Sequence, residues 1–560
     1  MSGPRLDRRR WLIGAGAASL AVTPGESFPA RAAPFPIGDA PGAAPELPGF
    51  DGQSVWPFRV DVPGRKANAY LWIPPRARRV RAVIIGQTIV IEKMFLEDPV
   101  IRELAARESM ALVWFNRNWG NRFVYDAVTR DHEVLEASLA ALARVSGYDE
   151  VATAPLVTIG HSASQGFAFN PAYWRPERVL AIISAKAGLG RPPAWDPEAS
   201  LKDTPILQVG AEIFELGAAY KLGDLDATAR QMAAYGAAHP GAAAIGLTKT
   251  GSGHFEWSQD LSRYAADFIA AAARARLPAR SGVGSAFRSV PPDRFWLVDT
   301  RAPQRFEPAP APLYQGPPDE AMRVFDARLA RGLARFAEGR ERAPQWLGFR
   351  QHGRLVPALD GKLPELAFEP DADGESFSLR VERLVEPPAA GQAEPPRIPD
   401  SSAVRLRVAG WGWSCAQVGP DRFRIRFSRA EDNIDKVIIL AEHPGDDRYR
   451  PVVQPVLIRI PTRRASGLAQ TISFPPLPEL RRGAAPTPLK ATASSGLPVR
   501  YYVKEGPAYV DPRDRLVLTE PPALTAGPLV ITVVAYQWGR DGENPVQTAT
   551  PVARTTRLSL

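Results

Sequence analysis

The run Leu156-Val157-Thr158-Ile159-Gly160-His161-Ser162-Ala163-Ser164-Gln165-Gly166 places a serine between small residues, directly after four residues typical of a buried strand. A serine on a sharp strand-to-helix turn is exposed at the edge of a sheet, and small residues two positions before and after it let the backbone close. Gly160 fits this G-x-S-x-G pattern, and Ser164 stands where a second glycine is usual. The run therefore predicts a nucleophile, Ser162, with an ordinary polar turn as the alternative.

A base for this serine must come from the six histidines of the chain. When a serine sits on such a turn, the acid and then the histidine follow it in the chain, each after a later strand. Five histidines fit poorly, because they precede the serine, adjoin it, lie before the last strand or fall in other predicted domains: His132, His161, His239, His352 and His443. His254 follows the apolar run 244–247 in a glycine-rich loop, so we predict that it is the base.

An acid is expected shortly after the buried strand 205–210. Glu212 is the first candidate and Glu215 the second, and Asp224 and Asp226 are more distant alternatives. Each of these carboxylates could equally be a solvated surface group.

With these motifs, residues 51 to 273 resemble the α/β-hydrolase superfamily. The resemblance implies that Ser162 attacks an acyl carbon, that His254 carries the proton, and that neither a metal nor an organic cofactor is needed. It also implies an oxyanion hole made by two backbone N–H groups. One belongs to Ala163 and the other to Gln87 or Thr88, after the buried strand 80–85.

The order of predicted elements in this region favours an α/β fold with a mostly parallel, doubly covered sheet. We expect an opening hairpin over 55–73, strands at 80–85, 110–115 and 179–183, and amphipathic helices at 98–105, 131–145 and 260–273. Ligands bind at the carboxyl ends of such strands. Four aromatic residues near those ends are candidates for facing the substrate, with core packing as the alternative for each: Trp114, Trp119, Phe255 and Trp257.

The first 32 residues have the features of a twin-arginine export signal. Arg8, Arg9 and Arg10 precede a short run rich in glycine and alanine, and Ala30-Arg31-Ala32 offers a cleavage site. The run is too short to span a bilayer. We therefore predict an exported, periplasmic or extracellular protein. Its single cysteine, Cys415, excludes an intramolecular disulfide.

The net charge of +9 at first favours nucleic-acid binding. Beyond the N-terminus the basic residues are scattered in short clusters, and no nucleic-acid-binding motif accompanies them. The charge therefore predicts at most a weak attraction to anionic surfaces or polymers.

The rest of the chain divides by composition. A hydrolase domain over 33–276 is followed by a proline-rich linker over 277–345, with one docking helix at 319–337. From 346 to 465 the pattern alternates with period two, at 376–381, 404–408 and 423–427, which predicts a β-sandwich. Residues 371–375 read as a hairpin turn and not as a calcium loop, because the full ligand spacing is missing.

The last section, 466–560, resembles bacterial immunoglobulin-like modules at 471–475, 491–499 and 506–510. Such modules serve as spacers, adhesion units or polymer contacts, and the resemblance implies no chemistry for this section.

These observations predict an exported serine hydrolase, most simply a carboxylic-ester hydrolase acting on a polymer- or cell-surface-associated acyl ester. Two alternatives remain open. One is a peptidase on the same scaffold. The other is a surface adhesion or glycan-binding protein whose hydrolase domain is inactive.

Overall fold

The computed structural model describes residues 54–117, 119–120, 122–214, 221–278, 286–357, 363–409, 415–429 and 436–560. The predicted export signal and its cleavage site therefore lie outside the described residues, as does Glu215.

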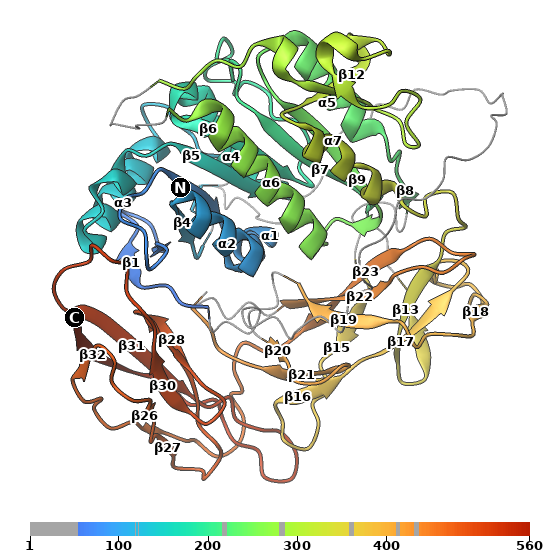
Figure 1. Cartoon of the computed structure of the whole chain (residues 1–560). Coiled ribbons are helices and arrows are strands. Elements are labelled where there is room, and N and C mark those ends of the chain that lie inside the picture. Colours follow the sequence, from blue (N-terminus) through green and yellow to red (C-terminus); the bar gives the residue numbers. More distant parts are fainter. Residues whose placement is uncertain are drawn as a thin grey trace, which may run out of the picture. The chain divides into compact units, whose positions relative to one another are not determined.

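A twelve-stranded sheet forms the centre of the N-terminal half, and its strand order is β1-β2-β4-β3-β5-β6-β7-β9-β12-β10-β11, with β8 on β7 (Figure 1). The first nine strands are β1 (Phe58–Asp61), β2 (Asn68–Trp72), β3 (Ala82–Gln87), β4 (Met110–Phe115), β5 (Leu156–His161), β6 (Val179–Ala185), β7 (Ile206–Phe214), β8 (Lys221–Leu222) and β9 (Ala244–Gly253). Strands β4, β3, β5, β6, β7 and β9 run parallel. In this sheet β4 lies between β2 and β3, so β3 and β4 are exchanged relative to their order in the chain. This exchange is typical of an α/β-hydrolase fold and confirms the predicted fold class.

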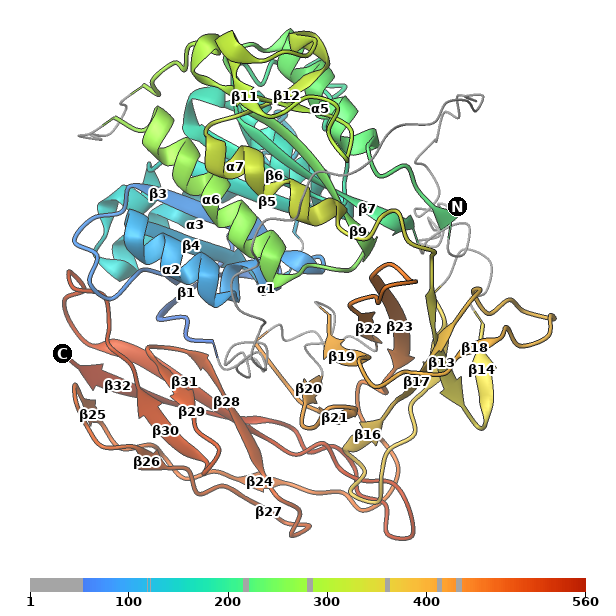
Figure 2. The same cartoon turned by 45° about the vertical axis from the view of Figure 1, so that its right-hand side comes forward.

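Helices cover both faces of this sheet because its central strands are apolar on both sides. The helices are α1 (Ile91–Glu97), α2 (Pro99–Glu108), α3 (Asp131–Ser146), α4 (Gln165–Trp174), α5 (Ala227–Ala238) and α6 (Gln259–Arg276). Ala82 and Ile84 of β3 belong to one buried cluster with residues of α1, α2 and α6, whereas Val83 and Ile85 belong to a second with residues of α3 and α4. Figure 2 shows α1, α2 and α6 over one face of the sheet. Asp98 caps α2 by accepting a hydrogen bond from the Val100 N–H at 2.8 Å, as its position before Pro99 predicted.

The section expected to be a linker is part of the sheet. Three short strands, β10 (Trp296–Asp299), β11 (Ala309–Pro310) and β12 (Ala321–Val324), extend it beyond β9. The single helix expected over 319–337 is wrong, since that segment contains β12, a short α7 (Ala327–Gly332) and a 3-10 turn (Ala334–Ala337). The buried side chains of Met322 and Val324 belong to β12, and those of Leu329 and Phe336 belong to the helical turns after it.

The section from 346 is all-β and contains three small sheets. Their strands are β13 (Trp346–Gln351), β14 (Arg354–Val356), β15 (Glu365–Ala367), β16 (Ser376–Ser378), β17 (Arg380–Leu384), β18 (Arg397–Ile398), β19 (Arg405–Val408), β20 (Cys415–Gln417), β21 (Arg422–Ile425), β22 (Lys436–His443) and β23 (Val452–Arg459). The three runs of alternating sequence all form strands. The Asp373 carboxylate accepts the N–H groups of Glu375 and Ser376 before β16, so this segment is a turn. It is not the predicted hairpin turn, because β15 before it and β16 after it belong to different sheets.

The last section is also all-β, and its strands pair mostly antiparallel. They are β24 (Ile472–Ser473), β25 (Leu480–Arg481), β26 (Thr487–Pro488), β27 (Thr492–Ala493), β28 (Arg500–Glu505), β29 (Ala508–Val510), β30 (Arg515–Leu518), β31 (Leu529–Tyr536) and β32 (Val552–Ser559). The immunoglobulin-like character of this section stays a prediction. Within the described part of the chain, no helix combines the length and apolar character that crossing a membrane requires.

Candidate active site

Ser162 occupies the turn that joins β5 to α4. Its φ angle is +50°, a left-handed backbone conformation that residues other than glycine rarely adopt. Strain of this kind is typical of functional turns. Gly160 allows the turn to close, because a Cβ at this position would lie 2.3 Å from the Ser164 carbonyl oxygen. Ser162 is half-buried.

Ser164 replaces the second glycine of the pattern without disrupting the turn. It is fully buried, and its hydroxyl accepts a hydrogen bond from the Gln87 side-chain amide at 3.3 Å. The glycine that is sterically required lies two residues later. A Cβ on Gly166 would lie 2.5 Å from the Cα atom of Arg122, which belongs to backbone that cannot easily move.

His254 follows β9 directly and reaches the serine. Its Nε2 atom lies 2.9 Å from the Ser162 Oγ atom, across a sequence separation of 92 residues. The side chain is buried, and its ring packs against that of Phe255. This is the distance at which an imidazole can take the proton of a serine hydroxyl.

The surroundings of His254 keep the imidazole neutral. Burial and the nearby Lys186 ammonium group lower the pKa of His254 from 6.5 to about 4. Lys186 is itself buried, donating to the Gly210 carbonyl at 2.7 Å and lying 3.7 Å from the Glu256 carboxylate. A neutral imidazole is the form that accepts a proton, so His254 has the protonation state that a base needs near neutral pH.

A second histidine, His161, holds the backbone of the first. Its Nε2 atom lies 2.9 Å from the His254 carbonyl oxygen, and the two ring centroids are 4.8 Å apart. Because a carbonyl can only accept, Nε2 of His161 carries the proton. Burial and neighbouring positive charge hold the pKa of His161 well below its usual value. The sequence showed this histidine only as part of the serine motif.

Glu212, the first candidate for the acid, lies beside the histidine loop and not against the imidazole. It is buried at the end of β7, where one carboxylate oxygen accepts the Gly251 N–H and the other pairs with the Arg450 guanidinium. With these two partners, the Glu212 carboxylate holds the loop that carries His254. It does not orient the His254 ring. Asp224 and Asp226 pair with Arg230 and Arg340 instead.

Arg450 belongs to the all-β section that begins at residue 346. It comes just before β23, which packs against β9. The contact is close, since a Cβ on Gly251 would lie 2.0 Å from the Pro451 carbonyl oxygen. No local sequence pattern predicts this contact, because Arg450 is 238 residues from its partner Glu212. The all-β section therefore helps to shape the histidine loop.

The three residues whose backbone N–H groups are candidates for the oxyanion hole differ in their surroundings. Thr88 donates its N–H to the Phe115 carbonyl at 3.0 Å, so this group is already used. Gln87 is the last residue of β3, fully buried, and its side-chain amide also donates to the Gly120 carbonyl at 3.0 Å. Ala163 is exposed in the first turn after the serine, where N–H groups lack helical partners.

The four aromatic candidates divide into core and site. Trp114 is fully buried, stacks on Tyr70 at 5.1 Å and donates to the Thr88 hydroxyl, so the expectation that it faces substrate is wrong. Trp257 is also a core residue, because it is 3% exposed and donates to the Ser262 hydroxyl at 3.0 Å. Phe255 supports the His254 ring from within the core. Trp119 alone of the four is partly exposed, edge-on to Phe115.

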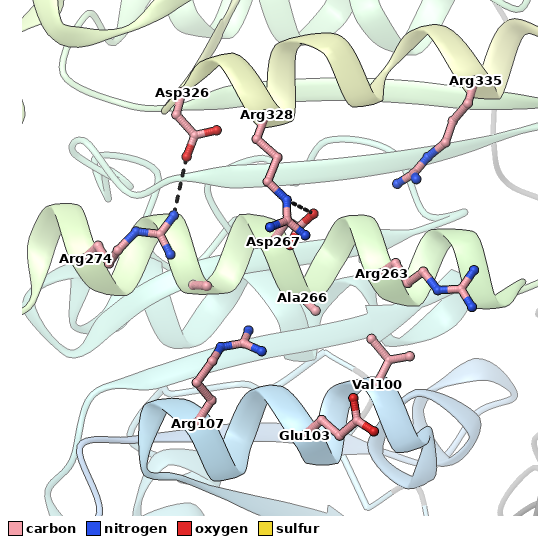
Figure 3. Close-up of a pocket in the computed structure, with 11 residues that line it drawn as sticks. Val100, Glu103, Arg107, Arg263, Ala266, Asp267, Arg274, Asp326, Arg328 and Arg335 are labelled. Atoms are coloured by element: carbon pink, nitrogen blue, oxygen red, sulfur yellow. Dashed lines mark hydrogen bonds and ion pairs between the residues drawn. The ribbon is translucent and has the colours of Figure 1, made fainter. Parts of the chain in front are cut away.

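A hollow of about 410 Å³ lies on a different part of the domain, between α2, α6 and α7 (Figure 3). Arginine and acidic side chains line it and pair across it, with Arg328 2.8 Å from Asp267 and Arg274 3.4 Å from Asp326. None of the predicted site residues lines it. Across the described ranges, no three His, Cys, Asp or Glu side chains gather as ligands of a metal ion would.

No protein-family model matches this sequence, and a comparison with curated proteins also found no match. Several solved structures are similar to part of it. They include LpqC, a poly(3-hydroxybutyrate) depolymerase from Bordetella parapertussis (16% identity, 28% of this chain and 67% of that chain, TM-score 0.22). Another is described as a predicted CIB-like hydrolase, from Thermoplasma acidophilum (14% identity, 38% of this chain and 96% of that chain, TM-score 0.26). A third is the acetyl xylan esterase from Aspergillus awamori (10% identity, 29% and 74%, TM-score 0.22). The strand order and the geometry of Ser162 and His254 carry the conclusion that this chain contains an α/β-hydrolase fold.

Proposed function

We propose that this protein hydrolyses carboxylic esters with Ser162 as the nucleophile and His254 as the general base. The observation that carries the proposal is the 2.9 Å contact between Ser162 Oγ and His254 Nε2, made by a serine held at a positive φ angle on a strand-to-helix turn. These are the features that an activated serine requires.

In the proposed reaction, Ser162 Oγ attacks the acyl carbon while His254 Nε2 takes the hydroxyl proton. The tetrahedral intermediate collapses to an acyl-enzyme as His254 returns the proton to the leaving alcohol. Water then repeats the sequence with His254 as base and releases the acid. The N–H of Ala163, at the start of the helical turn, stabilises the oxyanion, with Gln87 contributing the second donor as the resemblance implies.

For the acid, we propose Glu215 in place of Glu212. Glu212 has both carboxylate oxygens engaged by Gly251 and Arg450, whereas Glu215 follows the same strand at the spacing expected of the acid. Glu215→Gln should therefore lower kcat by about a thousandfold or more, as loss of the acid does in comparable triads. Glu212→Gln should lower it much less, and the reverse order would assign the acid to Glu212.

The substrate proposal follows from the sequence. The export motif at the N-terminus and the all-β sections favour an acyl ester on a polymer or cell surface.

The proposed ester hydrolysis by Ser162 and His254 is tested by turnover of p-nitrophenyl acetate by the wild type, Ser162→Ala and His254→Gln. Loss of turnover in both variants, with unchanged folding, is expected. Cleavage of amides but not of short esters would favour a peptidase, and polymer binding without turnover would favour an adhesion protein.

A further inference from the structure

Glu92 is a buried carboxylate that lies between two loops of the proposed site and has no role in the mechanism above. It belongs to the first turn of α1 and is fully buried. Its Oε1 atom accepts the His161 N–H at 2.8 Å. Its Oε2 atom accepts two more N–H groups, from Ile89 at 3.0 Å and from Val90 at 3.1 Å.

These three N–H groups come from the segments that must stay aligned during the reaction. His161 directly precedes the nucleophile, and Ile89 and Val90 belong to the loop that follows Gln87 and Thr88. One carboxylate therefore links the nucleophile turn to the loop after β3. The link is tightly packed, since a Cβ on Gly86 would lie 3.2 Å from the Glu92 Cβ atom and 2.9 Å from the Ile159 side chain.

The placement is costly, which argues that it serves more than packing. Burial raises the pKa of Glu92 to about 7, against the hydrogen bonds from the backbone, which lower it. Among the described residues, the partners of this carboxylate are backbone N–H groups and not a cation. A buried charge without a paired cation is expensive in a fold, and such groups concentrate at functional sites.

We propose that Glu92 is a positioning residue, which fixes the loop after β3 against the nucleophile turn so that the oxyanion donors on the two segments keep their spacing. This inference rests on the proposed function. It assigns to Glu92 no contact with the substrate, since it acts only through the backbone of His161, Ile89 and Val90.

Glu92→Gln is the informative variant because it keeps the shape of the side chain. A glutamine amide has one acceptor oxygen and one NH2 group, so whichever way it turns, its NH2 group faces an N–H donor and one of the two links is lost. Glu97→Gln is the matched control. Glu97 lies on the same helix and is also buried, but it binds Lys93, Ser54 and the Trp56 indole N–H, away from both loops.

The experiment compares wild type, Glu92→Gln and Glu97→Gln in p-nitrophenyl acetate turnover, in the rate of fluorophosphonate modification and in Tm. We expect Glu92→Gln to lower kcat by about 100-fold with KM nearly unchanged, because small misplacement of catalytic groups affects the transition state most. The modification rate should fall in parallel, since the phosphonyl oxygen needs the same donors. Glu97→Gln should lower Tm, because it leaves the Lys93 ammonium group buried without its carboxylate partner. It should nevertheless keep kcat within about threefold of wild type, as expected for a change that leaves the active site in place.

Equal kcat values for the two variants would overturn the inference. If Glu92→Gln is not recovered folded, Glu92→Asp replaces it with the same expectation, because its shorter side chain cannot span both loops. A failure of the proposed function looks different: turnover would then be absent in the wild type or would persist in Ser162→Ala, whereas the present inference fails only in an enzyme whose activity depends on Ser162.

Discussion

The Arg450 guanidinium, from the all-β part of the chain, pairs with the Glu212 carboxylate, whose other oxygen accepts the Gly251 N–H of the histidine loop. The carboxylate is 1% exposed and the arginine side chain 16% exposed. The all-β section thus takes part in the architecture of the proposed site.

Removing Arg450 should destabilise the protein and disturb the histidine loop. Arg450→Ala leaves the Glu212 charge buried without its partner, which typically costs about 3–5 kcal/mol in unfolding free energy. Arg422→Ala is the control, because Arg422 and Asp371 form an exposed pair in the same section, worth about 0–1 kcal/mol. Denaturant unfolding measures both. Equal effects would show that the Glu212 pair does not stabilise the loop.

The requirement for glycine should lie at Gly166 and not at position 164. Gly166→Ala puts a methyl group against the Arg122 backbone, so we expect a loss of about 1–3 kcal/mol and a lower kcat. Ser164→Gly removes only the hydrogen bond from Gln87, worth about 1 kcal/mol. Thermal unfolding and turnover of the two variants check this order, and it would be wrong if Ser164→Gly were the more damaging.

The fall of kcat toward acidic pH should reflect protonation of the Glu92 carboxylate. Protonation of a carboxyl oxygen breaks its links to the loop N–H groups, and burial raises the pKa of Glu92 to about 7. In the wild type, kcat should therefore fall as the pH drops below about 7. Glu92→Gln should lose this limb and keep the one set by His254, whose pKa burial lowers to about 4. A profile of kcat against pH from 4 to 9 tests this, and identical limbs in the two proteins would contradict it.

The stability of the wild type relative to Glu92→Gln should also depend on pH, with a definite sign. Between its ordinary pKa of 4.5 and its folded pKa of about 7, Glu92 binds more protons in the folded than in the unfolded state. Its contribution to stability is therefore present below pH 4.5 and is lost as the pH rises to 7, by about 3 kcal/mol.

Glu97 provides the opposite sign as a control. Although burial opposes it, the Lys93 ammonium group and the hydrogen bonds lower the pKa of Glu97 below its usual value. The stability of the wild type relative to Glu97→Gln should thus grow as the pH rises toward the ordinary pKa of 4.5 and stay level above it. Urea unfolding at about pH 3, 4.5, 6 and 7.5 measures both differences. A wild-type advantage over Glu92→Gln that does not fall between pH 4.5 and 7.5 would refute the assignment for Glu92.

The sequence predicted those parts of the site that have local signals. Ser162 and His254 could be found because each follows an apolar strand in a loop of small residues. The contacts of Glu212 could not be predicted, because its partner Arg450 comes from a distant section and no local pattern shows which carboxylate faces an imidazole. Glu92 was missed for the same reason, since three backbone N–H groups leave no trace in the sequence.

Errors in the fold have similar physical causes. The strands at 296–299 and 321–324 are short and flanked by prolines, so the composition suggested a linker although the residues complete the sheet. Trp114 and Trp257 were expected to face the substrate because they lie next to the functional loops in sequence. The sequence pattern does not show whether a side chain near the end of a strand points into the core or toward the site.

Peptide mapping of the full-length protein after reaction with a fluorophosphonate probe tests the central claim most directly. A serine activated by His254 should acquire a single phosphonyl adduct on the peptide that contains Ser162, and Ser162→Ala should acquire none while keeping the wild-type Tm. An unmodified Ser162 in folded wild-type protein, or an adduct of equal yield in Ser162→Ala, would contradict the account.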